Sequence, residues 1–227
     1  MSTSRELELE ALRVYRRYAS EVVERYGLCP WAASARREGR IAERVLVASE
    51  PQDALEPTLA ALDELAHAPQ IEIGLLLYPQ LCLDRFAFEH FVANVRARDA
   101  ARRELGATPF ALAAFHPEAP ARTDDAERLI PFLRRTPDPT IQLVRRDVLE
   151  RMRGPQGSGF VDVAMLTPQA LLAEAAEPLR RTIAKTNLET VCSVGVHVLE
   201  ALFEDIRRDR DESYEKLETS TGSRREG

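Results

Sequence analysis

The apolar residues of this chain follow two spacings, one typical of helices and one typical of strands. From about Glu6 to Tyr26, apolar side chains recur mostly at helical spacing between charged ones, which predicts a long amphipathic first helix. Ile71–Tyr78 contains few charges, so we expect it to be a central strand. In all, four short, apolar-rich stretches are predicted to be strands: Ile41–Ala48, Ile71–Tyr78, Phe110–Pro117 and Thr140–Arg145.

Helical patterns lie between these strands and after them. Pro57 is expected at the start of the helix before the second strand, because proline suits the first turn of a helix. A short helix is predicted over Asp125–Leu133. Another is expected to start at Thr167-Pro168, and Pro178 is expected to restart the chain into a long helix. Leu83–Leu105 is also predicted to be helical, with three residues facing the core: Phe86, Phe88 and Phe91.

This alternation of strands and helices predicts an α/β fold, with an α+β arrangement as the alternative. We expect a single-domain sandwich on a mixed sheet of four or five strands, with Phe160–Met165 as a candidate edge strand. The long N-terminal and C-terminal helices are expected to pack together. Residues 1–206 are predicted to form one globular domain. Residues 207–227 are charged and lack periodic apolar positions, which predicts a frayed helix end followed by a disordered tail.

Composition narrows the classes of function. An apolar share of 44% is enough for a core, and a net charge of −6 argues against a general nucleic-acid-binding protein. Because no apolar run approaches the roughly 20 residues that span a bilayer, no membrane partner is expected. The three cysteines, Cys29, Cys82 and Cys192, are too far apart to indicate a disulfide framework or a metal-binding pair. Their odd number, without an N-terminal signal peptide, predicts a cytoplasmic protein.

The turn after the first helix holds the first candidate for chemistry. Gly27 can adopt the left-handed conformation that ends a helix, and Pro30 suits the first position of a new one. Cys29 would then cap the new helix, where unpaired N–H groups and the helix dipole favour a reactive thiolate. The alternative is structural, with Cys29 a small buried side chain between the apolar anchors Leu28 and Trp31.

Three further polar residues lie at the ends of predicted strands. Glu72 is a carboxylate on a mainly apolar strand, although it could also lie at a frayed strand end. His116 ends its strand, where loops leave a sheet and ligands often bind; a satisfied structural histidine is the alternative. Arg135 lies in a stiff, proline-rich segment and could hold a carboxylate or phosphate, or else pair with Asp138 and lock the turn.

Five stretches, in the same order, resemble the motifs of a bacterial domain-of-unknown-function family, number fourteen-fifteen. The family motifs are Leu-Cys-Pro-Phe/Trp-Ala, Glu-Thr-Thr-Leu-Leu, Phe-His-Pro, Arg-Ser-Pro-Tyr-Pro-Thr and Asn-x-Glu-Thr. The corresponding stretches here are Gly27–Ala32, Ile71–Leu76, Phe115–Pro117, Arg135–Thr140 and Asn187–Thr190. This resemblance implies a shared site but no established activity.

The chain departs from the family pattern at several positions. Gln142 stands where the family usually has a histidine, and Asp138 replaces an aromatic residue. Ile73 and Gly74 replace two threonines. If the family chemistry needs that histidine as a ligand or a base, this chain has lost it. Whether Glu72 and His116 meet depends on strand direction, because neighbouring antiparallel strands would join them and parallel strands would separate them.

The leading functional hypothesis is an enzyme that acts on a small anionic metabolite. Its catalytic residues would be Cys29 as nucleophile, His116 as acid or base, and Glu72. The alternatives are a metal or haem site that uses Cys29 and His116, and a non-catalytic binding or assembly module, with a homodimer through the C-terminal helix. The substrate, reaction and cofactor stay unknown. The predicted substrate-binding residues are Arg135, as an anion clamp, with Gln142, Arg145, Asn187 and Trp31.

Overall fold

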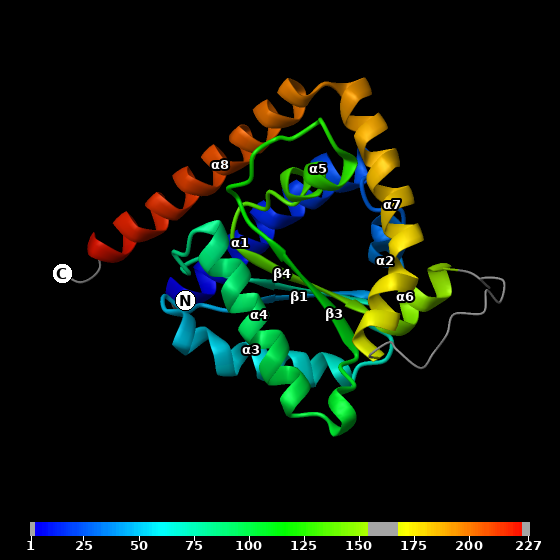
Figure 1. The fold of residues 1–227 in the computed structure, drawn as a ribbon. Coiled ribbons are helices and arrows are strands. Elements are labelled where there is room, and N and C mark those ends of the chain that lie inside the picture. Colours follow the sequence, from blue (N-terminus) through cyan, green and yellow to red (C-terminus); the bar gives the residue numbers. More distant parts are fainter. Residues whose placement is uncertain (1–2, 154–167, 224–227) are drawn as a thin grey trace.

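The computed structural model describes residues 3–153 and 168–223 (Figure 1). The candidate edge strand at Phe160–Met165 lies outside this range. Within it, no helix is long and apolar enough to cross a membrane. The elements, in chain order, are α1 (Thr3–Tyr18), the π-helix η1 (Ala19–Glu24), α2 (Ala32–Arg37), β1 (Ile41–Val45), α3 (Pro51–Ala66), β2 (Ile73–Leu77), α4 (Arg85–Ala101), the 3-10 helix η2 (Glu104–Gly106), β3 (Phe110–Phe115), α5 (Ala126–Leu133), β4 (Thr140–Arg145), α6 (Arg146–Arg153), α7 (Pro168–Val194) and α8 (Val196–Ser223).

The four strands form one mixed sheet in the order β1-β2-β4-β3. β1 runs parallel to β2, and β4 runs antiparallel to both of its neighbours. β2 is therefore paired on both sides, and all five of its residues are buried, so the prediction of a central strand is confirmed. The predicted α/β class with a four-stranded mixed sheet is confirmed as well.

Each face of the sheet packs against its own set of helices, and the alternation along β2 decides which side chain goes where. Ile73, Leu75 and Leu77 join the core beneath α1, α5, α7 and α8. Leu76 points to the other face and joins the core beneath α3 and α4. Gly74 also faces that side, where a Cβ atom would lie 2.8 Å from a Leu65 side-chain carbon. The missing side chain thus allows α3 to pack closely on the sheet.

The first and last long helices pack together, as predicted (Figure 1). α8 runs to Ser223, however, so the predicted disordered tail is helical up to that residue. Tyr214 is buried in this segment and packs against Leu7 and Ala11 of α1. The helix is longer than the frayed end expected from the sequence, because its contacts with α1 combine the packing of Tyr214 with ion pairs of Asp209, and neither gives an apolar periodicity.

Three local predictions are wrong. Pro178 does not start a new helix, because α7 already begins at Pro168 and runs to Val194. α3 begins at Pro51, and Pro57 lies inside it. The helix continues past this proline. The Thr58 hydroxyl donates a hydrogen bond to the Ala54 carbonyl at 2.6 Å. Phe86 is 63% exposed and stacks under the Arg85 guanidinium. At about 100° per residue, Phe86 points away from the helix face that buries Phe88.

Candidate functional site

A cavity of about 730 Å³ lies over the sheet face that carries α1, α5 and α7. Its floor consists of strand residues that share this face: Ile41, Ile73, Leu75, Ala111, Ala113, Gln142 and Val144. The walls come from η1, the turn after it, α5 and α7. Known small-molecule sites span roughly 300–1,000 Å³ and are mainly apolar with a few polar groups. The size and lining of this cavity therefore suit a small organic ligand.

The turn over residues 27–31 forms one wall of the cavity. Gly27 has a φ of 61°, as predicted, and the next N–H, from Leu28, bonds to the Val23 carbonyl at 2.9 Å. The prediction that Pro30 starts the new helix is wrong, because α2 begins only after Trp31. Cys29 therefore precedes the helix by three positions and does not cap it.

Cys29 lines the cavity, but its thiol differs from the predicted thiolate. The main-chain N–H groups of Trp31 and Ala32 favour the charged form of the thiol and act to lower its pKa. Burial has the larger effect and raises the pKa of the thiol above its usual value. Burial therefore favours the neutral thiol of Cys29, in contrast to the thiolate expected at a helix N-terminus, and a catalytic role of Cys29 stays a prediction.

Three more of the predicted site residues line the same cavity. Asn187 of α7 donates its side-chain N–H to the Leu28 carbonyl at 3.2 Å. Gln142 of β4 lies between Leu75 and Ala113 in the sheet, and its amide makes no hydrogen bond to any residue whose side chain the structure describes. Trp31 lines the cavity too, and its buried indole N–H has no partner in the described part of the chain.

Glu72 and Arg145 lie away from the cavity. Glu72 is buried just before β2 and pairs with Arg40 at 2.6 Å and Arg151 at 2.9 Å. The Arg145 guanidinium donates to main-chain carbonyls at the end of α3 and in the loop that follows it, including Leu65 at 2.7 Å and Ile71 at 2.6 Å. The Glu72 carboxylate therefore joins the start of β2 to Arg40 before β1 and to Arg151 of α6, and Arg145 joins the end of β4 to the connection between α3 and β2.

His116 lies at the opposite end of the sheet from Glu72. β2 and β3 run parallel to each other with β4 between them, so the start of β2 and the end of β3 are far apart. His116 is only 6% exposed. Its Nε2 bonds to the Leu83 carbonyl at 2.9 Å, and its Nδ1 accepts the Glu118 N–H at 3.2 Å. Both ring nitrogens have main-chain partners, as expected for a satisfied structural histidine.

Arg135 does not line the cavity either. Its Nε donates to the Ala119 carbonyl, and its guanidinium lies 4.8 Å from the centre of the Phe132 ring. The alternative pairing of Arg135 with Asp138 is wrong. Asp138 is buried and accepts hydrogen bonds from Arg210 at 2.9 Å and from the Tyr214 hydroxyl at 2.6 Å. The neighbouring Arg134, which the sequence analysis passed over, is the arginine of this segment that lines the cavity.

Two other lining residues were missed. Tyr15 lies at an apolar position of α1. Its hydroxyl makes no hydrogen bond to any described residue, and the apolar spacing of the sequence does not reveal this. Burial raises the pKa of Tyr15 well above its ordinary value. Arg36 pairs with Glu24 at 2.6 Å and with Glu43 at 3.1 Å. No local pattern distinguished this arginine from the other surface arginines of the chain.

The described residues include no group of three or more His, Cys, Asp and Glu side chains that could hold a metal ion. Zinc and iron sites in proteins usually need three or four such ligands. The proposed pair of Cys29 and His116 would also require His116 to give up one of its two main-chain hydrogen bonds. The geometry thus lends no support to a metal or haem site on this pair.

Comparison with known proteins gives one match. The family model described as "Protein of unknown function (DUF1415)" matches residues 10–154, which is more than half of the chain. No curated protein and no solved structure matches. The matched stretch contains Cys29, Trp31 and Gln142 and ends before α7, which supplies Asn187.

Proposed function

The chain belongs to the DUF1415 family of proteins of unknown function, and we propose that it binds a small organic molecule in the cavity between its sheet and helices α5 and α7. The observation that carries the proposal is the cavity of about 730 Å³ lined together by Cys29, Trp31, Gln142 and Asn187. These side chains come from the turn after η1, from β4 and from α7. An apolar floor with a few polar groups around it is typical of small-molecule sites.

The proposal departs from the anionic substrate and the Cys-His-Arg site expected from the sequence. That hypothesis relied on Arg135 as an anion clamp and on His116 as an acid or base. Both side chains have main-chain partners outside the cavity. The proposed function does not include the predicted homodimer through the C-terminal helix, because α8 packs apolar residues such as Leu199 and Phe203 into the core of its own chain.

Intrinsic fluorescence offers a direct test, because Trp31 is the only tryptophan and lines the cavity. A fragment library would be screened on the full chain for changes in Trp31 emission together with a rise in melting temperature. We expect hits that are lost in Ala113→Phe, which fills the cavity floor. Ala60→Phe, on the exposed side of α3, is the matched control and should bind as wild type does. A library without hits, or hits indifferent to Ala113→Phe, would overturn the proposal.

A second candidate function is thiol-dependent catalysis at Cys29. One observation favours it: the main-chain N–H groups of Trp31 and Ala32 act to lower the pKa of the thiol, and such groups stabilise negative charge during a reaction. The test is turnover of a bound hit by wild type and by Cys29→Ser. Product formation that Cys29→Ser abolishes without weakening binding would support catalysis. Binding without product in wild type would leave ligand binding as the function.

A further inference from the structure

The floor of the cavity is ordered in rows that run across the sheet. The pairing register places one residue from each strand in the longer row: Ile41, Ile73, Val144 and Ala111. A shorter row lies beside it: Leu75, Gln142 and Ala113. Neighbouring strands lie about 4.8 Å apart, so the longer row extends over about 14 Å. The cavity therefore has a long, apolar floor in the direction that crosses the strands.

Trp31 lies at the β1 end of these rows. α2 begins directly after Trp31, and Arg36 of α2 pairs with Glu43 of β1 at 3.1 Å. Glu43 is two residues from Ile41 in β1 and shares its face of the sheet. The turn that carries Cys29 and Trp31 consequently lines the cavity near the strand where the longer row begins.

The other end of the rows lies at the edge of the sheet, because β3 is the last strand and pairs only with β4 in the described part of the chain. Arg96 of α4 is exposed, lines the cavity at this edge and donates from Nη2 to the Leu112 carbonyl of β3 at 3.1 Å. This neutral carbonyl is its one partner among the described residues. The Arg134 guanidinium also lines this end and lies 5.2 Å from the centre of the Phe115 ring of β3.

The carboxylates of the lining are matched within the protein. Glu24 pairs with Arg36 at 2.6 Å and Glu89 with Arg85 at 3.3 Å, and Glu127 has a partner as well. A negative group at the β3 edge therefore meets an arginine, Arg96, that no carboxylate of the described residues neutralises. Because Arg96 is exposed, such a group keeps much of its hydration and avoids the cost of burying a charge.

We propose that the ligand is a linear amphiphile with one acidic group, whose alkyl chain lies along the row from Ala111 to Ile41 and whose acidic group bonds to Arg96. A chain of about ten to twelve carbons matches the row, since each C–C bond adds roughly 1.3 Å to an extended chain. This assignment rests on the proposed function and specifies its ligand class. It also returns to the anionic ligand expected from the sequence, with Arg96 in place of Arg135.

The alkyl chain is tested first, by calorimetry on the full chain with hexanoate, octanoate and decanoate below their micelle concentrations. We expect the affinity to rise about fourfold for each added methylene, as burial of one CH₂ group predicts. Ala113→Phe, on the cavity floor, should abolish this binding, whereas Ala60→Phe should not. Dodecyl phosphate, measured beside dodecanoate, identifies which acidic group is preferred. Affinity that does not depend on chain length, or that Ala113→Phe leaves unchanged, would overturn the proposal.

The acidic group is tested by comparing decanoate with decan-1-ol in wild type and in Arg96→Gln. The variant should weaken decanoate binding about threefold, the usual range for an exposed ion pair, and leave decan-1-ol unchanged. Arg98→Gln, at an exposed position of α4 outside the lining, is the matched control. An equal effect of Arg96→Gln on both probes, or none on decanoate, would overturn the role of Arg96. A retained chain-length dependence shows that the variant is folded.

The direction of the chain is tested with Trp31, the one tryptophan of the sequence, because a bromine atom quenches an indole that it contacts. The probe 12-bromododecanoate carries bromine at the end of its chain and should quench Trp31 at the β1 end of the cavity. The probe 4-bromododecanoate carries it near the acidic group and should bind with much less quenching. The reverse pattern would place the acidic group beside Cys29 and overturn the assignment to Arg96.

The outcomes distinguish the ligand class from the general function. If no amphiphile binds but compounds of the fragment library bind and are lost in Ala113→Phe, the ligand class is wrong and the proposed function stands. If neither the amphiphiles nor the library compounds bind, the proposed function itself is wrong.

Discussion

The side-chain amide of Asn187 donates to the main-chain carbonyl of Leu28 at 3.2 Å, across 159 positions of sequence. This bond joins α7 to the turn that presents Cys29 and Trp31. It thereby connects two of the stretches that resemble family motifs, although they lie near opposite ends of the chain. The bond holds two walls of the cavity together, so its loss should affect both stability and the exposure of Cys29.

Asn187→Ala should lower the free energy of unfolding by about 1–2 kcal/mol, because it leaves the buried Leu28 carbonyl without its donor. Urea denaturation measures this change. The same variant should alkylate faster at Cys29 than wild type, since the turn is no longer tied to α7. Asn94→Ala, at an exposed position of α4, is the control and should change neither quantity appreciably. An unchanged stability for Asn187→Ala would show that the bond is of little consequence.

Cys29 should be the slowest cysteine to alkylate in the folded protein. Its pKa is raised by burial, whereas Cys82 and Cys192 are exposed. Rates measured by peptide mass spectrometry between pH 7 and pH 10 should still be rising for Cys29 above the reference thiol pKa of about 8.5, where the rate of an ordinary thiol levels off. In urea the three rates should converge. Rapid modification of Cys29 at pH 7 would contradict this and would instead favour the reactive thiolate.

His116→Ala should destabilise the fold by about 2–3 kcal/mol, because it removes two hydrogen bonds of a buried side chain. It also removes the contact of the imidazole with the Phe88 ring, whose centre lies 5.9 Å away. His90→Ala on the exposed face of α4 should have an effect near zero. The measurement is urea unfolding of both variants. Full stability in His116→Ala together with lost ligand binding would return His116 to the functional site.

Tyr214→Phe should cost about 1.5–3 kcal/mol, because the hydroxyl is one of the donors to the buried Asp138 carboxylate. Asp138 stands where the family motif has an aromatic residue, and its partners Tyr214 and Arg210 belong to α8. Tyr26→Phe, whose residue is partly buried and makes no such bond, is the control. Equal stabilities of the two variants in chemical denaturation would show that this contact between α8 and Asp138 adds little.

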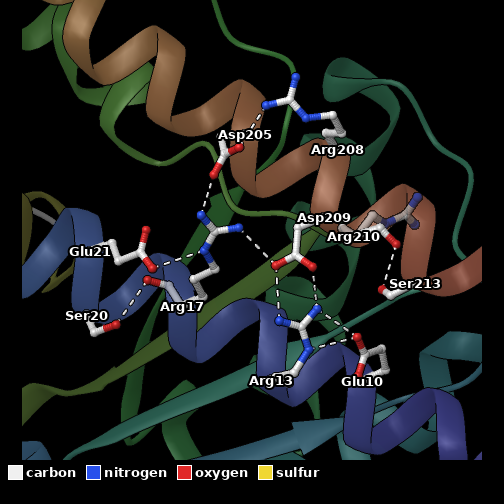
Figure 2. Close-up of polar contacts among 10 residues, drawn as sticks. All are labelled: Glu10, Arg13, Arg17, Ser20, Glu21, Asp205, Arg208, Asp209, Arg210 and Ser213. Carbon is white, nitrogen blue, oxygen red and sulfur yellow. Dashed lines mark hydrogen bonds and ion pairs between the residues drawn. The ribbon is translucent and has the colours of Figure 1, made fainter.

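Asp209 of α8 accepts hydrogen bonds from Arg13 and Arg17 of α1 (Figure 2), at 2.7–3.0 Å. Asp209→Asn should lower stability at pH 7 by about 0.5–1 kcal/mol, the usual range for partly exposed ion pairs. High salt should reduce the difference. Asp124→Asn, which breaks a fully exposed pair with Arg128, is the control.

The pH dependence of the Asp209→Asn effect has a definite sign. The bonds from Arg13 and Arg17 lower the pKa of Asp209 in the folded protein. The stabilisation is therefore complete above the unfolded pKa of about 3.9 and is lost as the pH falls through the lower folded value. Denaturation curves at pH 7 and pH 2.5 check this. A difference between wild type and variant that persists undiminished at pH 2.5 would contradict the assignment.

Part of the candidate site could be predicted from the sequence. Cys29, Trp31, Gln142 and Asn187 were singled out by their motifs and line one cavity, and their role in binding stays a prediction. Tyr15 could not be found this way, because a tyrosine at helical spacing has the same pattern whether its hydroxyl meets protein or an open cavity. Arg134 and Arg135 differ only in which way each points, and that depends on how α5 ends.

The sequence by itself determined the features that depend on local chemistry. The run Ile73–Leu77 has no polar side and therefore has to be buried on both faces of the sheet. Gly27 ends the first helix with a positive φ, which favours glycine. Only the tertiary structure decided where the polar groups meet. Strand order sends Glu72 and His116 to opposite ends of the sheet. The charge of Cys29 depends on the apolar walls that other segments bring to it, and their desolvation outweighs the two neighbouring N–H groups.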